Sequence, residues 1–122
     1  MKRDMGLVRA ILLTLAEHEQ GYAPPNLEIP GYSEEQIGFH AYIMGQAGLL
    51  ETINMTPDTS RTPLAMAVAI TWRGYEFLEA ARSDTVWKKA MTQFAKAGVG
   101  VSFEVLKQVL LRAAKDQLGI PG

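Results

Sequence analysis

Cysteine is absent from the 122 residues of this chain. Its absence excludes disulfides, zinc sites built from thiolates, and cysteine nucleophiles. The two histidines, His18 and His40, fall on different predicted helices, and neither has a second ligand in a suitable position. We therefore expect no bound metal and no cofactor.

Long apolar runs are also missing. No stretch approaches the roughly 18 residues of a membrane-spanning helix. The amino-terminal sequence "MKRDMGLVRAILLTLAEHEQ" carries charged residues within and after its apolar stretch, which is unlike a secretory signal peptide. We expect a soluble, cytoplasmic protein without a membrane partner.

Basic residues are scarce in the first two thirds of the chain. Residues 33–55 contain no Lys or Arg, and residues 1–80 carry five basic against ten acidic side chains. Residues 81–122 reverse the balance, with seven basic against three acidic side chains. Neutralisation of phosphates by basic side chains supplies most of the sequence-independent affinity of a protein for DNA. The acidic balance of residues 1–80 therefore argues against these residues binding a duplex on their own.

Apolar periodicity and capping residues predict a mainly α-helical fold with a small β-hairpin, an α+β class. Ser33 is placed to cap the second helix and Gly48 to end it. The predicted elements are helices over 3–19 and 34–47 with a short strand at 27–29 between them, strands over 49–55 and 66–71 joined by a polar loop, and helices over 72–82, 85–97 (capped by Asp84) and 103–118. We assign residues 1–82 to a core and residues 83–122 to a C-terminal helical extension packed on it.

Two segments resemble bacterial winged-helix regulators. "HAYIMGQAGLLE" is similar to their "HLxxLxxAGLI" pattern, and "ITWRGYEFLEA" is similar to the "LTxxGxxFL" segment that follows the wing. Together with "MKRDMGLVRAILL", "FLEAARSDTVW" and "VSFEVLKQVLLRAAKDQLG", they make nearly the whole chain resemble a family of small bacterial and prophage proteins, domain-of-unknown-function family 2513. The resemblance implies a winged-helix-like fold and no particular activity. Unlike a full helix-turn-helix, the chain has no room for a supporting helix before Ser33.

The first functional hypothesis follows from this resemblance. It is a dimeric DNA-binding regulator of prophage or bacterial genes that contacts double-stranded DNA through basic side chains and through the glutamines of the second helix. The candidate DNA-binding residues are Lys2, Arg3, Gln36, Gln46, Arg61 and Arg73.

The second hypothesis comes from the outward face of the same helix. At about 100° per residue, the face opposite the apolar stripe carries Phe39, Tyr42 and Ile43 but no basic residue. Aromatic residues dominate the energetics of protein interfaces. The alternative is therefore a protein-interaction module that keeps the winged-helix shape and does not bind DNA.

Catalytic arrangements are not recognisable. His40 falls in the apolar stripe of its helix, where a buried, hydrogen-bonded histidine is the more frequent role. No serine has the surroundings of a nucleophile elbow, and the glycines of "AGVGVS" lack the lysine of a phosphate-binding loop. We expect no enzymatic activity.

The last predicted helix is apolar over more than half of its circumference. Such a helix is either buried on two sides within its own chain or paired with a second subunit. We expect a homodimer. The candidate dimerisation residues are Val105, Val109, Leu111 and Leu118.

Overall fold

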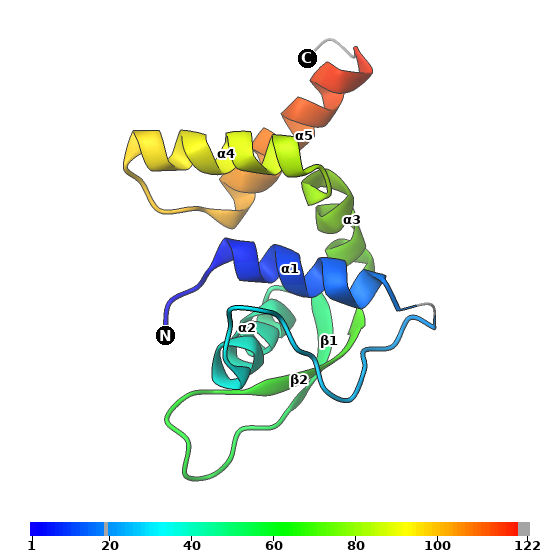
Figure 1. Cartoon of the computed structure of the whole chain (residues 1–122), viewed down its shortest axis with the longest axis vertical. Coiled ribbons are helices and arrows are strands. Elements are labelled where there is room, and N and C mark those ends of the chain that lie inside the picture. The colour runs from blue at the N-terminus through cyan, green and yellow to red at the C-terminus, as the bar shows by residue number, and fades with distance from the viewer. Residues whose placement is uncertain (19, 120–122) are drawn as a thin grey trace. The chain divides into compact units, whose positions relative to one another are not determined.

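The computed structural model describes residues 1–18 and 20–119. It is mainly helical with one two-stranded antiparallel sheet, which confirms the predicted α+β class (Figure 1). The elements are α1 (Met5–Ala16), α2 (Glu34–Gln46), β1 (Leu50–Asn54), β2 (Ala65–Ile70), α3 (Trp72–Ala81), α4 (Asp84–Ala97) and α5 (Phe103–Leu118). Within the described residues, no helix is both long and apolar enough to cross a bilayer.

The chain divides into two compact units, Met1–Glu76 and Phe77–Gly122. The division falls inside α3, six residues before the boundary expected after residue 82. The first unit therefore contains α1, α2, the hairpin and the start of α3, and the second contains the rest of α3 with α4 and α5.

Side-chain caps fix where the first two helices begin. The Asp4 carboxylate accepts a hydrogen bond from the Leu7 amide at 3.2 Å, so α1 begins at Met5 and not at the predicted residue 3. It ends at Ala16, and the predicted end at residue 19 lies outside the described residues. The predicted Ser33 cap is confirmed, and the Gln36 side chain completes a capping box by accepting from the Ser33 amide at 2.8 Å.

The hairpin is packed against α2. The strands pair from Leu50 with Ile70 to Asn54 with Ala65, with a bulge after Glu51. Two glycines of α2 let the hairpin approach closely. A Cβ at Gly45 would lie 2.6 Å from the Thr52 hydroxyl, and a Cβ at Gly38 would lie 3.1 Å from the Leu64 side chain.

The strand predicted at 27–29 is wrong. These residues are irregular, and Ile29 is buried as a core side chain. The extra pairing occurs earlier, where Tyr22 forms an isolated bridge with Ala69 and the Ala23 amide donates to the Val68 carbonyl at 2.8 Å. The prolines after Ala23 have no amide hydrogen and end the pairing there. Residues 20–33 contain no helix, as the sequence predicted.

The second unit is built on one buried face of each helix. Leu106 and Leu110 of α5 are fully buried, and the rings of Phe77 and Phe103 lie 4.9 Å apart. Asp84 was predicted to cap the fourth helix, and this is wrong. The cap is Ser83, whose hydroxyl accepts from the Val86 amide at 3.3 Å, and Asp84 is the first helical residue, where its negative charge suits the helix dipole.

Candidate functional site

Two parts of the segments that carry the winged-helix resemblance, "AGLL" and "TWRG", form a junction inside the first unit. The Thr71 amide donates to the Leu49 carbonyl at 3.1 Å, and the Thr71 hydroxyl donates to the Gly48 carbonyl. The same hydroxyl caps α3 by accepting from the Gly74 amide at 3.0 Å. These contacts join the end of α2 to the start of α3, so the "AGLL" and "TWRG" residues perform a structural task here.

His40 is held by both of its ring nitrogens. Its Nε2 accepts from the Asp4 amide at 2.8 Å, and its Nδ1 lies 2.8 Å from the Gln36 carbonyl, to which it donates in the matching tautomer. The side chain is 1% exposed, and the Phe39 ring meets it edge-on at 5.7 Å. Neither nitrogen has a lone pair left for a metal or for accepting a proton from a substrate. Within the described part of the chain, no three His, Asp or Glu side chains are grouped as metal ligands.

Asp4 and Tyr32 form a polar contact beside this histidine. The Tyr32 hydroxyl donates to the Asp4 carboxylate at 2.9 Å. This hydrogen bond, with smaller contributions from burial and from the negative charge of Asp4, raises the pKa of Tyr32 above its ordinary value. Asp4 therefore ties the loop before α2 to the start of α1.

The raised pKa of Tyr32 predicts a stability difference at alkaline pH. The neutral phenol is favoured in the folded state, so the contribution is complete below about pH 10, the unfolded pKa. It is lost as the pH rises through the higher folded pKa. We expect Tyr32→Phe to be less stable than wild type by no more than about 1 kcal/mol at pH 8. Urea unfolding should show this difference shrinking or reversing near pH 11, and an unchanged difference would contradict the assignment.

The six candidate DNA-binding residues do not form one cluster. Lys2, Arg3, Gln46, Arg61 and Arg73 are exposed, whereas Gln36 is half-buried and its side chain is used in the capping box. Arg61 lines a shallow cleft with Glu34 and Glu35 at the start of α2. Arg73 lies beside Gly48 at the other end of α2, about 20 Å away by the rise of the helix.

Acidic groups occupy the start of the helix that would read DNA. The loop between β1 and β2 folds back beside α2 (Figure 1), where the Thr62 hydroxyl donates to the Glu35 carboxylate at 2.8 Å. Glu34 and Glu35 would both repel phosphate at the end of the helix that most often enters a groove. Of the described residues that line the adjoining cleft, only Arg61 is a cation.

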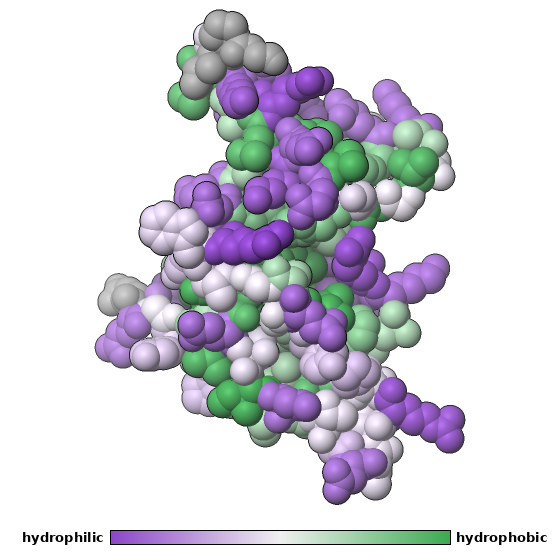
Figure 2. All heavy atoms as spheres, turned by 180° about the vertical axis from the view of Figure 1, so that it is seen from behind, coloured by the Kyte–Doolittle hydropathy of each residue, from purple (hydrophilic) through white to green (hydrophobic). Residues whose placement is uncertain are grey.

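The candidate partner-binding residues offer less surface than expected. Phe39, Tyr42 and Ile43 are all half-buried. Larger apolar exposure occurs on the hairpin, where Ile53 and Met66 are neighbours across the strands and are 49% and 38% exposed. Apolar side chains also reach the surface among hydrophilic ones on the face drawn in Figure 2. The further exposed apolar residues of the first unit, beyond its amino-terminal methionine, are Tyr22, Met55, Trp72 and Tyr75.

Sequence reasoning missed the hairpin pair. Ile53 and Met66 are neighbours because of the register between the two strands, and this register depends on the bulge after Glu51. No pattern in the sequence predicts that bulge. The alternation in "MAVAIT" does show that Met66 and Val68 share a face, but it does not show which face α2 covers.

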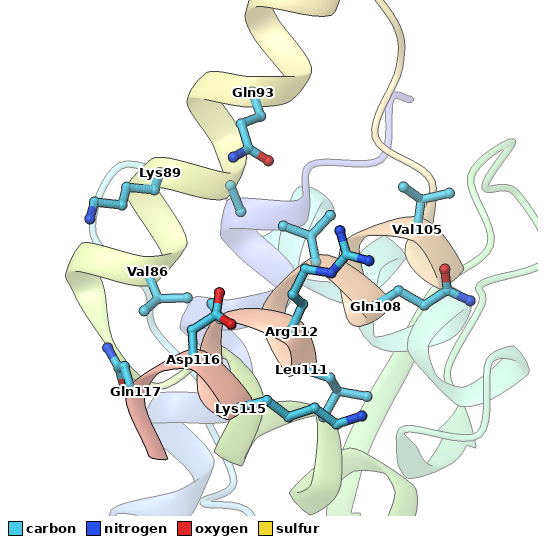
Figure 3. A pocket seen from close by; sticks show the side chains of 13 residues that line it. Val86, Lys89, Gln93, Val105, Gln108, Leu111, Arg112, Lys115, Asp116 and Gln117 are labelled. Carbon is cyan, nitrogen blue, oxygen red and sulfur yellow. The ribbon is translucent and has the colours of Figure 1, made fainter. Parts of the chain in front are cut away.

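Three of the four candidate dimerisation residues lie at one groove. Val105, Val109 and Leu111 line a groove between α4 and α5 in the second unit (Figure 3). Leu118 is not among the described residues that line it. Val105, Leu111 and Leu118 are exposed, and Val109 is half-buried. The homodimer stays a prediction.

Comparison with known proteins assigns the chain to a family. It belongs to the family described as hypothetical protein (DUF2513), whose model matches residues 2–100, and this confirms the family resemblance predicted from the sequence. The chain is also 32% identical over 111 residues to an uncharacterised protein of Haemophilus influenzae, covering 89% of this chain and 92% of the relative. No solved structure matches.

Proposed function

We propose that this DUF2513 family member is a protein-interaction module on a winged-helix-like scaffold. The observation that carries the proposal is the exposed outer face of the hairpin, where the apolar side chains of Ile53 and Met66 are adjacent across the two strands. Apolar side chains that adjoin one another at a surface are typical of interaction sites, whereas isolated ones are not.

The edge of the sheet supports the same proposal. β2 pairs with β1 on one side and with Tyr22 on the other. In the described part of the chain, β1 has a strand neighbour on one edge only. An extended segment of a partner could add to this edge by backbone hydrogen bonds and cover Ile53 with an apolar side chain. The partner that fits is a protein with an extended, apolar segment.

DNA binding is the second candidate, and one observation favours it. The first unit has α1, then the segment that pairs with β2 through Tyr22, then α2 and the hairpin. A winged helix without its supporting helix has its elements in this order. In this reading Lys2, Arg3, Arg61 and Arg73 would contact phosphates of prophage or bacterial operator DNA, and Gln46 would contact a base. The acidic start of α2 weighs against it.

Binding to mixed-sequence duplex DNA at low and physiological salt separates the two candidates. If the interaction proposal holds, wild type shows no binding even at low salt, because the net negative first unit repels phosphate. A DNA-binding protein would lose affinity steeply with salt, and Arg61→Ala with Arg73→Ala would flatten that slope by roughly one to two units. Such a result would replace the interaction proposal by the regulator.

A positive test uses the same arginine variant as a control. Wild type, Ile53→Ser with Met66→Ser, and Arg61→Ala with Arg73→Ala are immobilised and exposed to a bacterial extract. We expect a protein that is retained by wild type and by the arginine variant but is lost with the hairpin variant. Equal retention by all three would remove the hairpin from the proposal.

A further inference from the structure

The second unit contains a groove between α4 and α5 with a volume of about 780 Å³. The two helices are joined by the short connection 98–102, and their ribbons lie at an angle to one another with the lining side chains between and around them (Figure 3). Its apolar lining comes from both helices: Val86, Ala90, Val105, Val109, Leu111 and Ala113.

The groove is open to a partner. Val105 is 48% exposed and Val109 is half-buried, although both belong to an apolar lining. α4 has 14 residues, which is about 21 Å of helix. A partner helix of about four turns could therefore lie along the groove with one apolar side against the valines.

Charge decides between possible occupants. Lys89, Arg112 and Lys115 line the groove, and among the described lining residues Asp116 is the only acidic one. Figure 3 shows Gln93 from α4 and Arg112 from α5 projecting toward the space between the helices. A second copy related by a twofold axis would set the same mainly basic groove against itself, and the like charges of Lys89, Arg112 and Lys115 in the two copies would repel. A nucleic acid would leave the valine lining without apolar contacts.

We propose that the α4–α5 groove binds an amphipathic helix of another protein that carries Asp or Glu beside its apolar stripe. Aliphatic side chains of the partner cover Val105 and Val109, and its carboxylates pair with Lys89, Arg112 and Lys115. This surface belongs to the second unit and goes beyond the hairpin surface of the first, so either can be correct without the other.

The test uses fluorescein-labelled helical peptides of about 16 residues. All share leucines at i, i+3, i+4, i+7 and their repeats, and they differ only in having Glu, Gln or Lys at the flanking positions. Fluorescence anisotropy should show the Glu peptide binding at least tenfold more tightly than the Lys peptide, with an affinity that falls as salt rises.

Variants then place the peptide in the groove. Arg112→Glu should weaken binding of the Glu peptide at least tenfold and strengthen binding of the Lys peptide, and Val105→Glu should weaken binding of the Glu peptide. Both sites are exposed, so neither change removes a core side chain. Lys88→Glu is the matched control, because Lys88 is exposed on α4 and does not line the groove. Ile53→Ser with Met66→Ser should bind the peptide as wild type does.

Three outcomes would overturn the proposal. The first is a Glu peptide that binds no more tightly than the Lys peptide. The second is a wild-type dimer in analytical ultracentrifugation that Val105→Glu dissociates, which would assign the groove to a second copy. The third is duplex DNA binding that Arg112→Glu abolishes, which would make the basic rim a phosphate site.

Discussion

Replacing Gly74 with valine should destabilise the protein by about 3 kcal/mol or more. A Cβ at this position would lie 2.2 Å from the Leu49 carbonyl oxygen and 2.7 Å from the Ile70 side chain. The Leu49 oxygen belongs to the backbone, which cannot rotate away as a side chain can, so α3 would have to move away from the residue that precedes β1. Chemical denaturation followed by circular dichroism should show the midpoint falling while the slope is nearly unchanged.

Gly100→Ala is the control for this prediction. Gly100 has open space around its Cβ position and no positive φ, so alanine should change the stability by no more than about 0.5 kcal/mol. If Gly74→Val were as mild as Gly100→Ala, α3 would not approach Leu49 as closely as the structure shows.

The role of Gly74 shows what the sequence could and could not predict. Local signals such as the Ser33 cap and the glycine after α2 correctly located the second helix, because each acts within one turn of the chain. The contact between Gly74 and Leu49 joins residues 25 positions apart. A local sequence pattern does not show which residues that far apart will be in contact. The glycine of "TWRG" could therefore be matched to a family, but its close contact with Leu49 could not be predicted.

The smaller errors concern the cap of α4 and the strand predicted at 27–29. Ser83 and Asp84 are both good capping residues, and the structure uses the first. Residues 27–29 were predicted as a strand, but the bridge beside the hairpin is made by Tyr22, and Ile29 is buried in the core. In each case the choice depends on packing against another element, which composition alone does not specify.

The candidate surfaces were harder to predict than the fold. The wide apolar arc of α5 predicted a dimer face at Val105, Val109, Leu111 and Leu118. In the structure Leu106 and Leu110 belong to the core, and three of the four predicted residues line the groove. Periodicity shows how much of a helix is apolar and not which part another helix of the same chain covers. The sequence therefore predicted apolar surface on α5 without showing what covers it.

His40→Ala should be the second strongly destabilising change, by about 2 to 4 kcal/mol. The substitution leaves a cavity in place of a side chain that is 1% exposed, and it removes the acceptor of the Asp4 amide at the start of α1. Because Asp4 also caps α1 and accepts from Tyr32, the loss should loosen the start of that helix.

The other histidine provides the control for His40→Ala. His18 is exposed after the end of α1, so His18→Ala should change the free energy of unfolding by no more than about 0.5 kcal/mol. Urea unfolding gives the two free energies, and amide hydrogen exchange should show faster exchange in the first turn of α1 only for His40→Ala. Equal effects of the two substitutions would mean that the imidazole of His40 does not hold the amino-terminal segment. The histidine of the "HAYIMGQAGLLE" segment is thus expected to act through the Asp4 amide, as a structural link between α2 and α1, with no part in contacting DNA.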